Sequence, residues 1–296
     1  MANFRQVNEI DVAQVKPIID LALAEDLGQG DITSNLLIPP QLRGRAHILA
    51  KAKGILAGGE VAKQVFLCTD RSLKVKLLVK DGTEIKPGDI IATVSGSVAS
   101  ILRAERVALN FLQRLSGIAT QTAQHVVQVG DLPVKIVDTR KTSPGLRLLE
   151  KYAVRMGGGH NHRFDLSDAI LIKDNHLVAL RALGLSLKEI ITKARQNAPP
   201  GVTVEVEVTS AEEAVTAAEA GADVIMLDNM TPDEMRHAVD LIAGRAEVEA
   251  SGGIRLDNVR PVALTRVNFI SIGALTHSYR SLDISLELEP ESIKMR

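Results

Sequence analysis

The chain has 296 residues, of which 45% are hydrophobic and only 2% aromatic, and its formal net charge is -1. This length and hydrophobic content predict one large domain or two ordinary ones with an aliphatic core, which suits a parallel sheet covered by helices. The shortage of aromatic side chains argues against single-stranded nucleic-acid binding by base stacking, and the near-neutral charge gives no global attraction for polyanions.

Cysteine usage and the N-terminal residues bear on the compartment. Cys68 is the single cysteine, which excludes a disulfide framework and favours a reducing environment. Residues 1–16 carry both charge signs and lack the basic and apolar regions of a signal peptide. No apolar run reaches membrane-spanning length. We therefore expect a cytoplasmic protein that binds neither membranes nor nucleic acid.

The first part of the chain, to about residue 115, is expected to form a small α+β domain. Residues 12–22 have helical apolar spacing, and residues 25–34 are expected to follow as a loop. One turn region, 81–89, has the rhythm of a biotinyl or lipoyl carrier, but the nearby hairpin tip has no Lys, so ordinary turn chemistry explains it better. Strand-like segments separated by Gly- and Pro-containing turns occur at 46–50, 73–79 and 90–94.

The second part alternates strand and helix patterns. Residues 100–129 are expected to form one long helix or two, and Ser186 with Glu189 predicts a capping box at a later helix. About six βα units imply a parallel sheet, fewer than the eight of a complete barrel, so an incomplete α/β barrel and an open doubly wound sheet are both possible. The expected strands are 134–137, 169–172, 202–208, 224–227, 248–250 and 269–272, and the expected helices are 145–156, 186–197, 211–220, 232–243 and 256–265.

Polar residues follow each of these expected strands. The carboxyl ends of parallel strands meet at one face of a barrel, where catalytic residues lie. A single polar strand end means little, because surface loops are polar anyway, but the coincidence of all these ends on one face indicates an active site. The groups are 138–142, 173–176, 205–207, 228–229, 251–253 and 273–277.

The last two strand ends have the pattern of a phosphate site. Ser251, Gly252 and Gly253 follow the fifth strand, and Gly273 follows the sixth. Glycine lets backbone N–H groups approach phosphate oxygens, and a following helix N-terminus adds positive potential. A Gly-Gly pair alone could be a simple turn, but the further glycine at the next strand end favours phosphate.

Basic residues form a second group near these ends: Arg140, Lys141, Arg163 and Lys173. An arginine fork binds carboxylate or phosphate through two hydrogen bonds, whereas lysine acts as a point charge. Structural ion pairs are the alternative explanation. They explain Arg140 and Lys141 poorly, because two adjacent cations repel each other unless an anion lies between them.

A metal site is one interpretation of three histidines in this part of the chain. His160, His162 and His176 are of the right type, but no cysteine supports such a site and the surrounding cations oppose a divalent ion, so histidines that contact an anion are the better interpretation. Glu207 and Asp228, on neighbouring strands, are candidates for sugar hydroxyls or for Mg²⁺ carried by a phosphate substrate. Magnesium commonly uses one or two carboxylates together with substrate oxygens.

Taken in order, these motifs resemble the quinolinate phosphoribosyltransferase family (nicotinate-nucleotide pyrophosphorylase, carboxylating). The resemblance covers nearly the whole chain, and although no single tetrapeptide decides it, the ordered set is highly specific. The motifs that carry it are 25–28 with 30–34, 105–110 with 116–120, 139–142, 162–163, 173–176, 204–207, 227–229, 249–254 and 271–277.

The resemblance implies a domain arrangement and a reaction. An N-terminal open α+β sandwich would occupy 1–115, an incomplete α/β barrel of about six strands 116–278, and a C-terminal segment, 279–296, would return to the first domain. The family transfers phosphoribosyl from phosphoribosyl pyrophosphate to quinolinate with decarboxylation, giving nicotinate mononucleotide, pyrophosphate and CO₂ in NAD biosynthesis. It also implies Mg²⁺ and a homodimer or hexamer with a shared active site.

The same resemblance assigns roles to residues. Those expected to act catalytically are Lys141, Lys173, Glu207 and Asp228, with the lysines facing pyrophosphate and the two acids contacting ribose hydroxyls and Mg²⁺. Those expected to bind the quinolinate carboxylates are Arg140, His162, Arg163 and Lys173, with Arg106 reaching in from the partner subunit. Those expected to bind the ribose phosphate are Ser251, Gly252, Gly253, Gly273 and His277.

Three alternatives stay open at this point. In a Schiff-base aldolase, Lys141 beside Arg140 could be the nucleophile, because a neighbouring cation favours a neutral amine. A related phosphoribosyltransferase could use a different acceptor, although the paired cations argue for a diacid. A non-catalytic binding module is disfavoured by Glu207 and Asp228, which are expected to face the same mouth as the cations.

Overall fold

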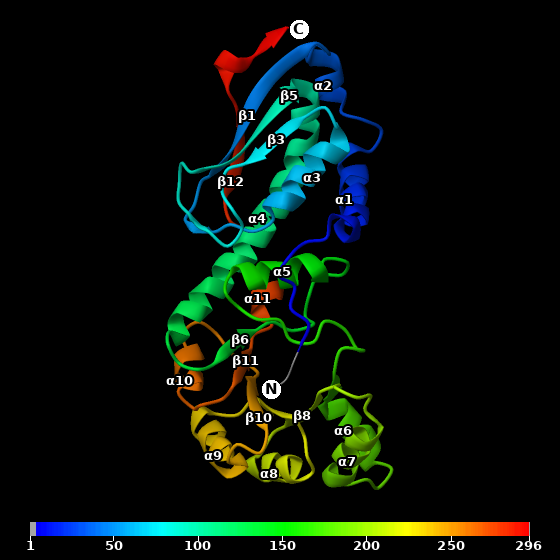
Figure 1. The fold of residues 1–296 in the computed structure, drawn as a ribbon, viewed down its shortest axis with the longest axis vertical. Helices are drawn as coiled ribbons and strands as arrows, with labels where there is room; N and C mark the ends of the chain where they lie inside the picture. The colour runs from blue at the N-terminus through cyan, green and yellow to red at the C-terminus, as the bar shows by residue number, and fades with distance from the viewer. Residues whose placement is uncertain (1–3, 296) are drawn as a thin grey trace. The chain divides into compact units, whose positions relative to one another are not determined.

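The structure is a computed structural model that describes residues 4–295 (Figure 1). Its contacts divide the described chain into two compact units, each built from separate stretches of sequence. The units thus interleave along the chain, and the described C-terminal residues from 278 belong to the same unit as residues 7–123. The sandwich unit comprises 7–123, 142–158 and 278–295, and the barrel unit comprises 4–6, 124–141 and 159–277.

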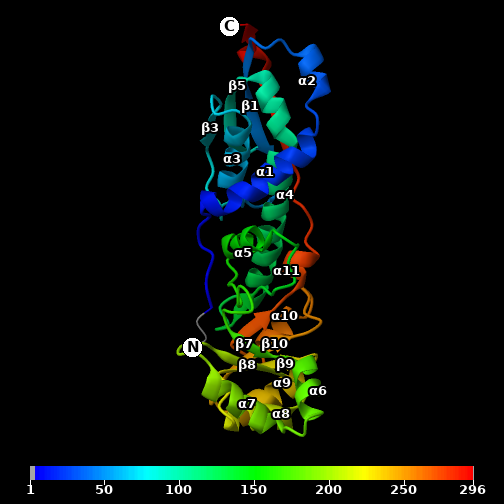
Figure 2. The ribbon, with the colours of Figure 1, turned by 90° about the vertical axis from the view of Figure 1, so that its right-hand side faces the viewer.

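An antiparallel sheet with the order β12-β1-β5-β3 forms the centre of the sandwich unit. Alternate residues of β1, among them Ala46 and Ile48, are buried, so one face of the sheet is covered. Helix α3 lies against the sheet and α1 packs on α3 (Figures 1 and 2). The strands are β1 (Leu42–Ala50), β2 (Gly54–Ile55), β3 (Lys74–Leu77), β4 (Glu84–Ile85), β5 (Ile90–Ser97), β12 (Ile284–Leu288) and β13 (Lys294–Met295).

Helix ends in this part of the chain depend partly on distant residues. The region expected as a loop at 25–34 is mostly helical, because Asp31 accepts a hydrogen bond from the Ser34 N–H at 2.9 Å and starts a short helix. The start of α3 is bound by the carboxylate of Asp81, 2.8 Å from the Gly58 nitrogen, which local sequence could not reveal. The helices are α1 (Val12–Leu27), α2 (Ile32–Leu37), α3 (Gly59–Thr69), α4 (Val98–Val129) and α5 (Arg147–Met156).

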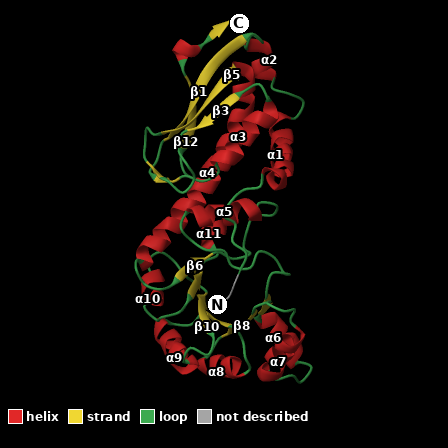
Figure 3. Cartoon of the chain, viewed as in Figure 1, coloured by secondary structure: helices red, strands yellow, loops and turns green. Residues whose placement is uncertain are grey.

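Six parallel strands in the order β6-β11-β10-β9-β8-β7 form the sheet of the barrel unit, which confirms the expected parallel α/β architecture. Helices alternate with the strands along the chain, as Figure 3 shows in red and yellow. The strands are β6 (Lys135–Val137), β7 (Ile170–Ile172), β8 (Val204–Val208), β9 (Val224–Asp228), β10 (Glu247–Ser251) and β11 (Phe269–Ser271).

The segment 160–163 connects the two edges of this sheet. His160 pairs with β6, since its N–H donates to the Ile136 carbonyl at 2.8 Å and its carbonyl accepts from the Asp138 N–H at 3.1 Å. Three residues later, Nη1 of Arg163 donates to the carbonyl of Ala169, just before β7, at 3.1 Å. Residues 160–163 therefore bridge the gap between β6 and β7 that six strands leave in a barrel.

Most barrel helices lie where the sequence predicts them. Ser186 and Glu189 form the expected capping box, with the Ser186 N–H 2.8 Å from the Glu189 carboxylate. The helix expected at 256–265 is shorter, because Asn258 accepts the Arg255 N–H at 2.7 Å and holds a turn there. The helices are α6 (Asp174–Arg181), α7 (Leu187–Asn197), α8 (Ala211–Glu219), α9 (Pro232–Ile242), α10 (Val259–Ala263) and α11 (Ala274–His277).

Within residues 4–295, every helix is too short or too polar to cross a bilayer.

Candidate active site

A cavity of about 560 Å³ opens at the carboxyl ends of the barrel strands. Lys173 directly follows β7, Glu207 lies near the end of β8, and Asp228 and Ser251 end β9 and β10. This is the face on which α/β barrels carry catalytic groups. The predicted site residues that line the cavity are Arg140, Lys141, His162, Arg163, Lys173, Glu207, Asp228, Ser251, Gly252 and Gly253.

Two further predicted residues, Gly273 and His277, do not line the cavity. A Cβ atom added to Gly273 would lie 2.8 Å from Cδ of Lys141 and 3.2 Å from Nε2 of His277, so a side chain at this turn would require the Lys141 side chain to move. The Thr276 hydroxyl in the same turn donates to the Lys141 carbonyl at 2.9 Å and holds the two loops together. Arg106 is exposed on α4, in the sandwich unit, and is not among the residues that line the cavity.

Two arginines place concentrated positive charge in the cavity. Arg163 is buried, and burial together with the charge of Arg140 lowers the pKa of its guanidinium, while Glu205 and Asp168 oppose this shift. The Nε of Arg140 is buried and, among the described residues, has no hydrogen-bond acceptor. A buried donor without an acceptor is costly, so an anion between these arginines would satisfy the donor and relieve the repulsion.

Two carboxylates line the same cavity on neighbouring strands. The Lys173 ammonium lies 3.2 Å from Oε2 of Glu207. Oδ2 of Asp228 accepts a hydrogen bond from the Asn229 side chain at 2.7 Å, and Asn229 itself has a φ of +54°. Carboxylate oxygens are the ligands that Mg²⁺ prefers, so these two acids fit a magnesium ion that is also held by substrate oxygens.

Glycine is required at positions 252 and 253, after β10, for two different structural reasons. Gly252 has a φ of +90°, and a Cβ atom there would lie 2.3 Å from Oδ1 of Asn229, so no side chain is accommodated. Gly253 also has a positive φ, but none of the described atoms lies within 4 Å of the position of its missing Cβ. The backbone of Gly253 is therefore open to approach, as a phosphate-binding turn requires.

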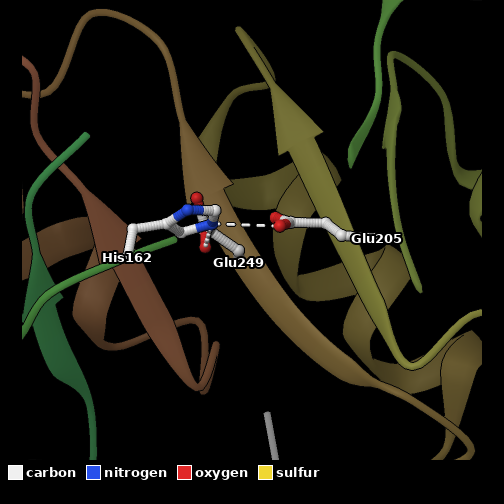
Figure 4. Close-up of side chains that lie close together, drawn as sticks. All are labelled: His162, Glu205 and Glu249. Carbon is white, nitrogen blue, oxygen red and sulfur yellow. Dashed lines mark ion pairs between the residues drawn. The ribbon is translucent and has the colours of Figure 1, made fainter. Parts of the chain in front are cut away.

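A buried cluster of His162, Glu205 and Glu249 was missed as a unit by the sequence analysis. Nε2 of His162 lies 3.0 Å from Oε2 of Glu205 and 3.3 Å from Oε2 of Glu249, as Figure 4 shows. Both glutamates have no exposed surface. The sequence held a signal, because strand side chains alternate and Glu205 must therefore face the same side as Glu207.

The cluster has unusual electrostatics. Burial lowers the pKa of His162, but Glu249 and Glu205 outweigh burial and raise it to about 10. Burial and the neighbouring Glu249 raise the pKa of Glu205, while His162 and Arg163 oppose that rise. Among the described residues this is the one group of three or more His, Cys, Asp or Glu side chains close enough together to surround a metal ion, and it contains neither His160 nor His176. Nδ1 of His176 instead accepts the Lys173 N–H at 3.0 Å.

A larger cavity, about 870 Å³, lies near the amino ends of β8 to β10. Its arginines are already paired with acids: Arg195 with Asp223 at 2.6 Å, Arg266 with Asp240, and Arg245 with Glu219 at 3.9 Å. This neutralisation leaves no surplus charge for an anion, in contrast to the cavity at the carboxyl ends. The smaller cavity is therefore the better active-site candidate.

Family comparisons agree with this geometry. The profile of the quinolinate phosphoribosyl transferase N-terminal domain matches residues 31–116, and that of the C-terminal domain matches residues 118–287. The chain belongs to this family. It is accordingly an enzyme of the quinolinate phosphoribosyltransferase family, which are pentosyltransferases.

Individual relatives cover almost the whole chain. A Bacillus subtilis (strain 168) protein named "Probable nicotinate-nucleotide pyrophosphorylase (carboxylating)" is 47% identical over 283 residues, 95% of this chain and 96% of its own. The mitochondrial quinolinate phosphoribosyltransferase (decarboxylating) 2 of Nicotiana glauca is 42% identical, over 94% of this chain and 83% of its own. The crystal structure of NadC from Streptococcus pyogenes superposes with a TM-score of 0.90 at 44% identity, over 95% and 98% of the two chains.

Proposed function

We propose that this enzyme transfers the phosphoribosyl group of phosphoribosyl pyrophosphate to quinolinate, with loss of CO₂, to give nicotinate mononucleotide and pyrophosphate. The observation that carries the proposal is the pairing of Arg140 and Arg163, two adjacent cations with a buried, unsatisfied N–H, in a cavity that also contains two carboxylates. An acceptor with two carboxylates suits such a site. Family membership supports this reaction and disfavours the Schiff-base aldolase.

The acceptor end of the site is assigned to the cations of the segment 160–163 and of the neighbouring strand ends. Arg140, His162, Arg163 and Lys173 would hold the two carboxylates of quinolinate and fix the direction of its ring nitrogen. Orientation is the main contribution here, because alignment of two bound reactants lowers the barrier to their reaction substantially.

The donor end is assigned to the glycine turns and the lysines. Ser251, Gly252 and Gly253 would bind the ribose phosphate, together with Gly273 and His277 on the next turn. Lys141 and Lys173 would face the pyrophosphate and stabilise its charge as the bond to the anomeric carbon breaks. The open space beside Gly253 and the exclusion of side chains at Gly252 support this assignment.

The chemistry needs no covalent nucleophile from the protein. The ring nitrogen attacks the anomeric carbon as pyrophosphate leaves, through a transition state with oxocarbenium character. Glu207 and Asp228 would contact the ribose hydroxyls and hold Mg²⁺, which when bound with substrate supplies further neutralisation of the leaving group. CO₂ then leaves from the ring carbon beside the alkylated nitrogen, whose positive charge stabilises the electron pair left on that carbon, and a proton from solvent takes the place of CO₂.

The assembly belongs to the same proposal. We propose a homodimer, or a hexamer built from it, in which the partner subunit's Arg106 completes the acceptor site. The exposure of Arg106 on α4 supports this role. We also propose that the enzyme acts in the cytoplasm, which its single cysteine supports.

A direct assay tests the reaction. Purified protein is supplied with carboxyl-labelled quinolinate, phosphoribosyl pyrophosphate and Mg²⁺, and release of CO₂ and formation of nicotinate mononucleotide are measured. Nicotinate replaces quinolinate as the control acceptor, since it lacks the second carboxylate. Product from quinolinate and none from nicotinate is expected, whereas turnover of nicotinate alone would refute the proposed acceptor.

A further inference from the structure

Two glutamates without exposed surface lie inside the barrel unit. Glu205 is on β8 and Glu249 is on β10, and both side chains converge on the imidazole of His162 (Figure 4). None of the roles proposed above uses either glutamate. A carboxylate without exposed surface is costly unless a positive charge compensates it, so the pair demands an explanation.

The groups around His162 supply such compensation. Nε2 of the imidazole lies within 3.3 Å of both carboxylates, and Arg163, next along the chain, also acts on Glu205. Within this group of four, a protonated His162 and Arg163 supply two positive charges for the two carboxylates, while Asp168 also acts on Arg163 and the buried Asp138 accepts the His162 backbone N–H. With a neutral imidazole, one negative charge would stay uncompensated in the interior, beside a cavity that has to accept an anion.

Other contacts fix the ring in place. Asp138, after β6, accepts the His162 backbone N–H at 2.9 Å, and the Phe4 ring stacks on the imidazole with 4.4 Å between ring centroids. His162 and Glu249 both line the cavity, together with the guanidinium of Arg140. The imidazole thus contacts both carboxylates and also borders the space in which the acceptor is proposed to bind.

We infer that Glu205 and Glu249 are positioning residues that hold His162 as a permanent imidazolium, so that His162 acts as a fixed cation at the acceptor site and not as a proton-transfer group. The inference rests on the proposed function for the identity of the anion. The charge state of His162 itself can be measured without any substrate. The pKa of about 10 given to His162 by its two carboxylate neighbours agrees with a ring that stays charged at neutral pH.

A metal ion in place of the proton is the competing interpretation. The three ligand atoms are close enough to surround one, but Arg163 already compensates part of the charge of Glu205. Counted over His162, Arg163 and the two glutamates, a divalent ion beside a neutral imidazole would leave one positive charge in excess. The protonated ring balances the charges without it.

The first experiment follows His162 by NMR in the wild-type protein without substrate. The ring signal is assigned with a His162→Gln variant and titrated between about pH 6 and pH 8, the range in which an ordinary histidine changes charge. A signal that stays in the imidazolium position throughout is expected. A titration step in this range, or stoichiometric metal in the purified protein with a ring signal that changes on chelation, would overturn the inference even if the enzyme is fully active.

The second experiment removes the carboxylates one at a time. Glu249→Gln, and then Glu205→Gln with Glu249→Gln, are compared with Glu247→Gln, which removes the same charge from the other end of β10. The ring is expected to begin titrating in the single variant and to do so at still lower pH in the double variant. As His162 loses its charge with rising pH, KM for quinolinate should rise by about tenfold while KM for phosphoribosyl pyrophosphate stays constant.

A rise in KM for quinolinate alone distinguishes loss of the His162 charge from a general structural defect. A variant that only loosens the barrel would impair both substrates at every pH. If the double variant folds and its ring stays charged, or if both KM values rise together without dependence on pH, the glutamates do not act through His162. Should the variants not fold, the wild-type titration still decides the question.

Discussion

The ammonium of Lys173 lies 3.2 Å from Oε2 of Glu207, across the ends of the neighbouring strands β7 and β8. The lysine side chain is 45% exposed, and ion pairs of this exposure contribute little to stability, about 0–1 kcal/mol. The pair therefore has little structural value, and it joins a cation proposed to face pyrophosphate to a carboxylate proposed to hold Mg²⁺. When pyrophosphate and Mg²⁺ bind, the ion pair can break so that each side chain contacts its own ligand, and little folding free energy is lost.

Replacement of Lys173 by Met should consequently affect activity far more than stability. We expect kcat/KM to fall by a factor equivalent to about 2–5 kcal/mol, because a charge that contacts a desolvated anion is lost, and the free energy of unfolding to change by less than about 1 kcal/mol. Lys51→Met, which breaks the exposed Lys51–Glu287 pair at 2.8 Å, is the control and should leave both quantities near wild type. A comparable loss of stability and activity in Lys173→Met would argue against the catalytic assignment.

Arg163→Ala should reduce kcat/KM for quinolinate by a factor equivalent to about 2–5 kcal/mol of transition-state stabilisation, since it removes one cation from a site proposed to hold a dianion. Steady-state kinetics with each substrate varied in turn are the measurement. Arg181→Ala serves as the matched control because Arg181 pairs with Glu213 at 2.6 Å on the exposed helix surface. Near-wild-type kcat/KM in Arg163→Ala would rule out its assigned role.

Gly252→Ala tests the phosphate turn. Its Cβ would lie 2.3 Å from Oδ1 of Asn229, in addition to the strain of a φ of +90°. Gly201→Ala has a similar φ, +82°, with free space around the added methyl, so it measures the backbone term alone, about 1–2 kcal/mol. Chemical denaturation should show a larger loss of stability for Gly252→Ala, and only that variant should raise KM for phosphoribosyl pyrophosphate. Equal effects of the two substitutions would contradict the proposed close packing.

The barrel and most of its site could be predicted because both depend on patterns local in sequence. Buried parallel strands read as aliphatic runs, and the residues that follow them must share one face. The start of α3 could not be predicted in this way, because the Asp81 side chain that binds it lies 22 residues from Gly59. The cluster around His162 joins three separate elements, and only the alternation of Glu205 with Glu207 hinted at it.

The position of the segment 160–163 could not be predicted from the sequence either. Nothing in the sequence near His160 indicates that it pairs with β6, because the partner strand lies more than twenty residues earlier. That pairing nevertheless decides where His162 and Arg163 lie. The sequence positions of strand ends predict which residues lie together on one face of the barrel. The positions of residues in a connecting segment depend instead on long-range backbone pairing.

The N-terminal residues support this segment from outside. The Phe4 ring stacks on His162, and Gln6 exchanges two hydrogen bonds with the Asn161 backbone, both at 2.9 Å. Phe4→Ala should raise KM for quinolinate about two- to tenfold through loss of the ring contact, with little effect on phosphoribosyl pyrophosphate. Phe4→Tyr keeps the stacking and should behave as wild type. The idea fails if the two variants have the same kinetics.

Subunit mixing tests whether the active site is shared. Arg106→Ala and Lys173→Ala homo-oligomers are each expected to be nearly inactive, since each lacks one cation in every site. If Arg106 serves the neighbouring subunit's site, a mixed dimer contains one site that lacks both cations and one that lacks neither. Mixing followed by subunit exchange should therefore restore part of the activity, and a mixture of labelled subunits followed by native mass spectrometry verifies the exchange. The absence of recovery despite proven exchange would show that Arg106 acts within its own subunit or not at all.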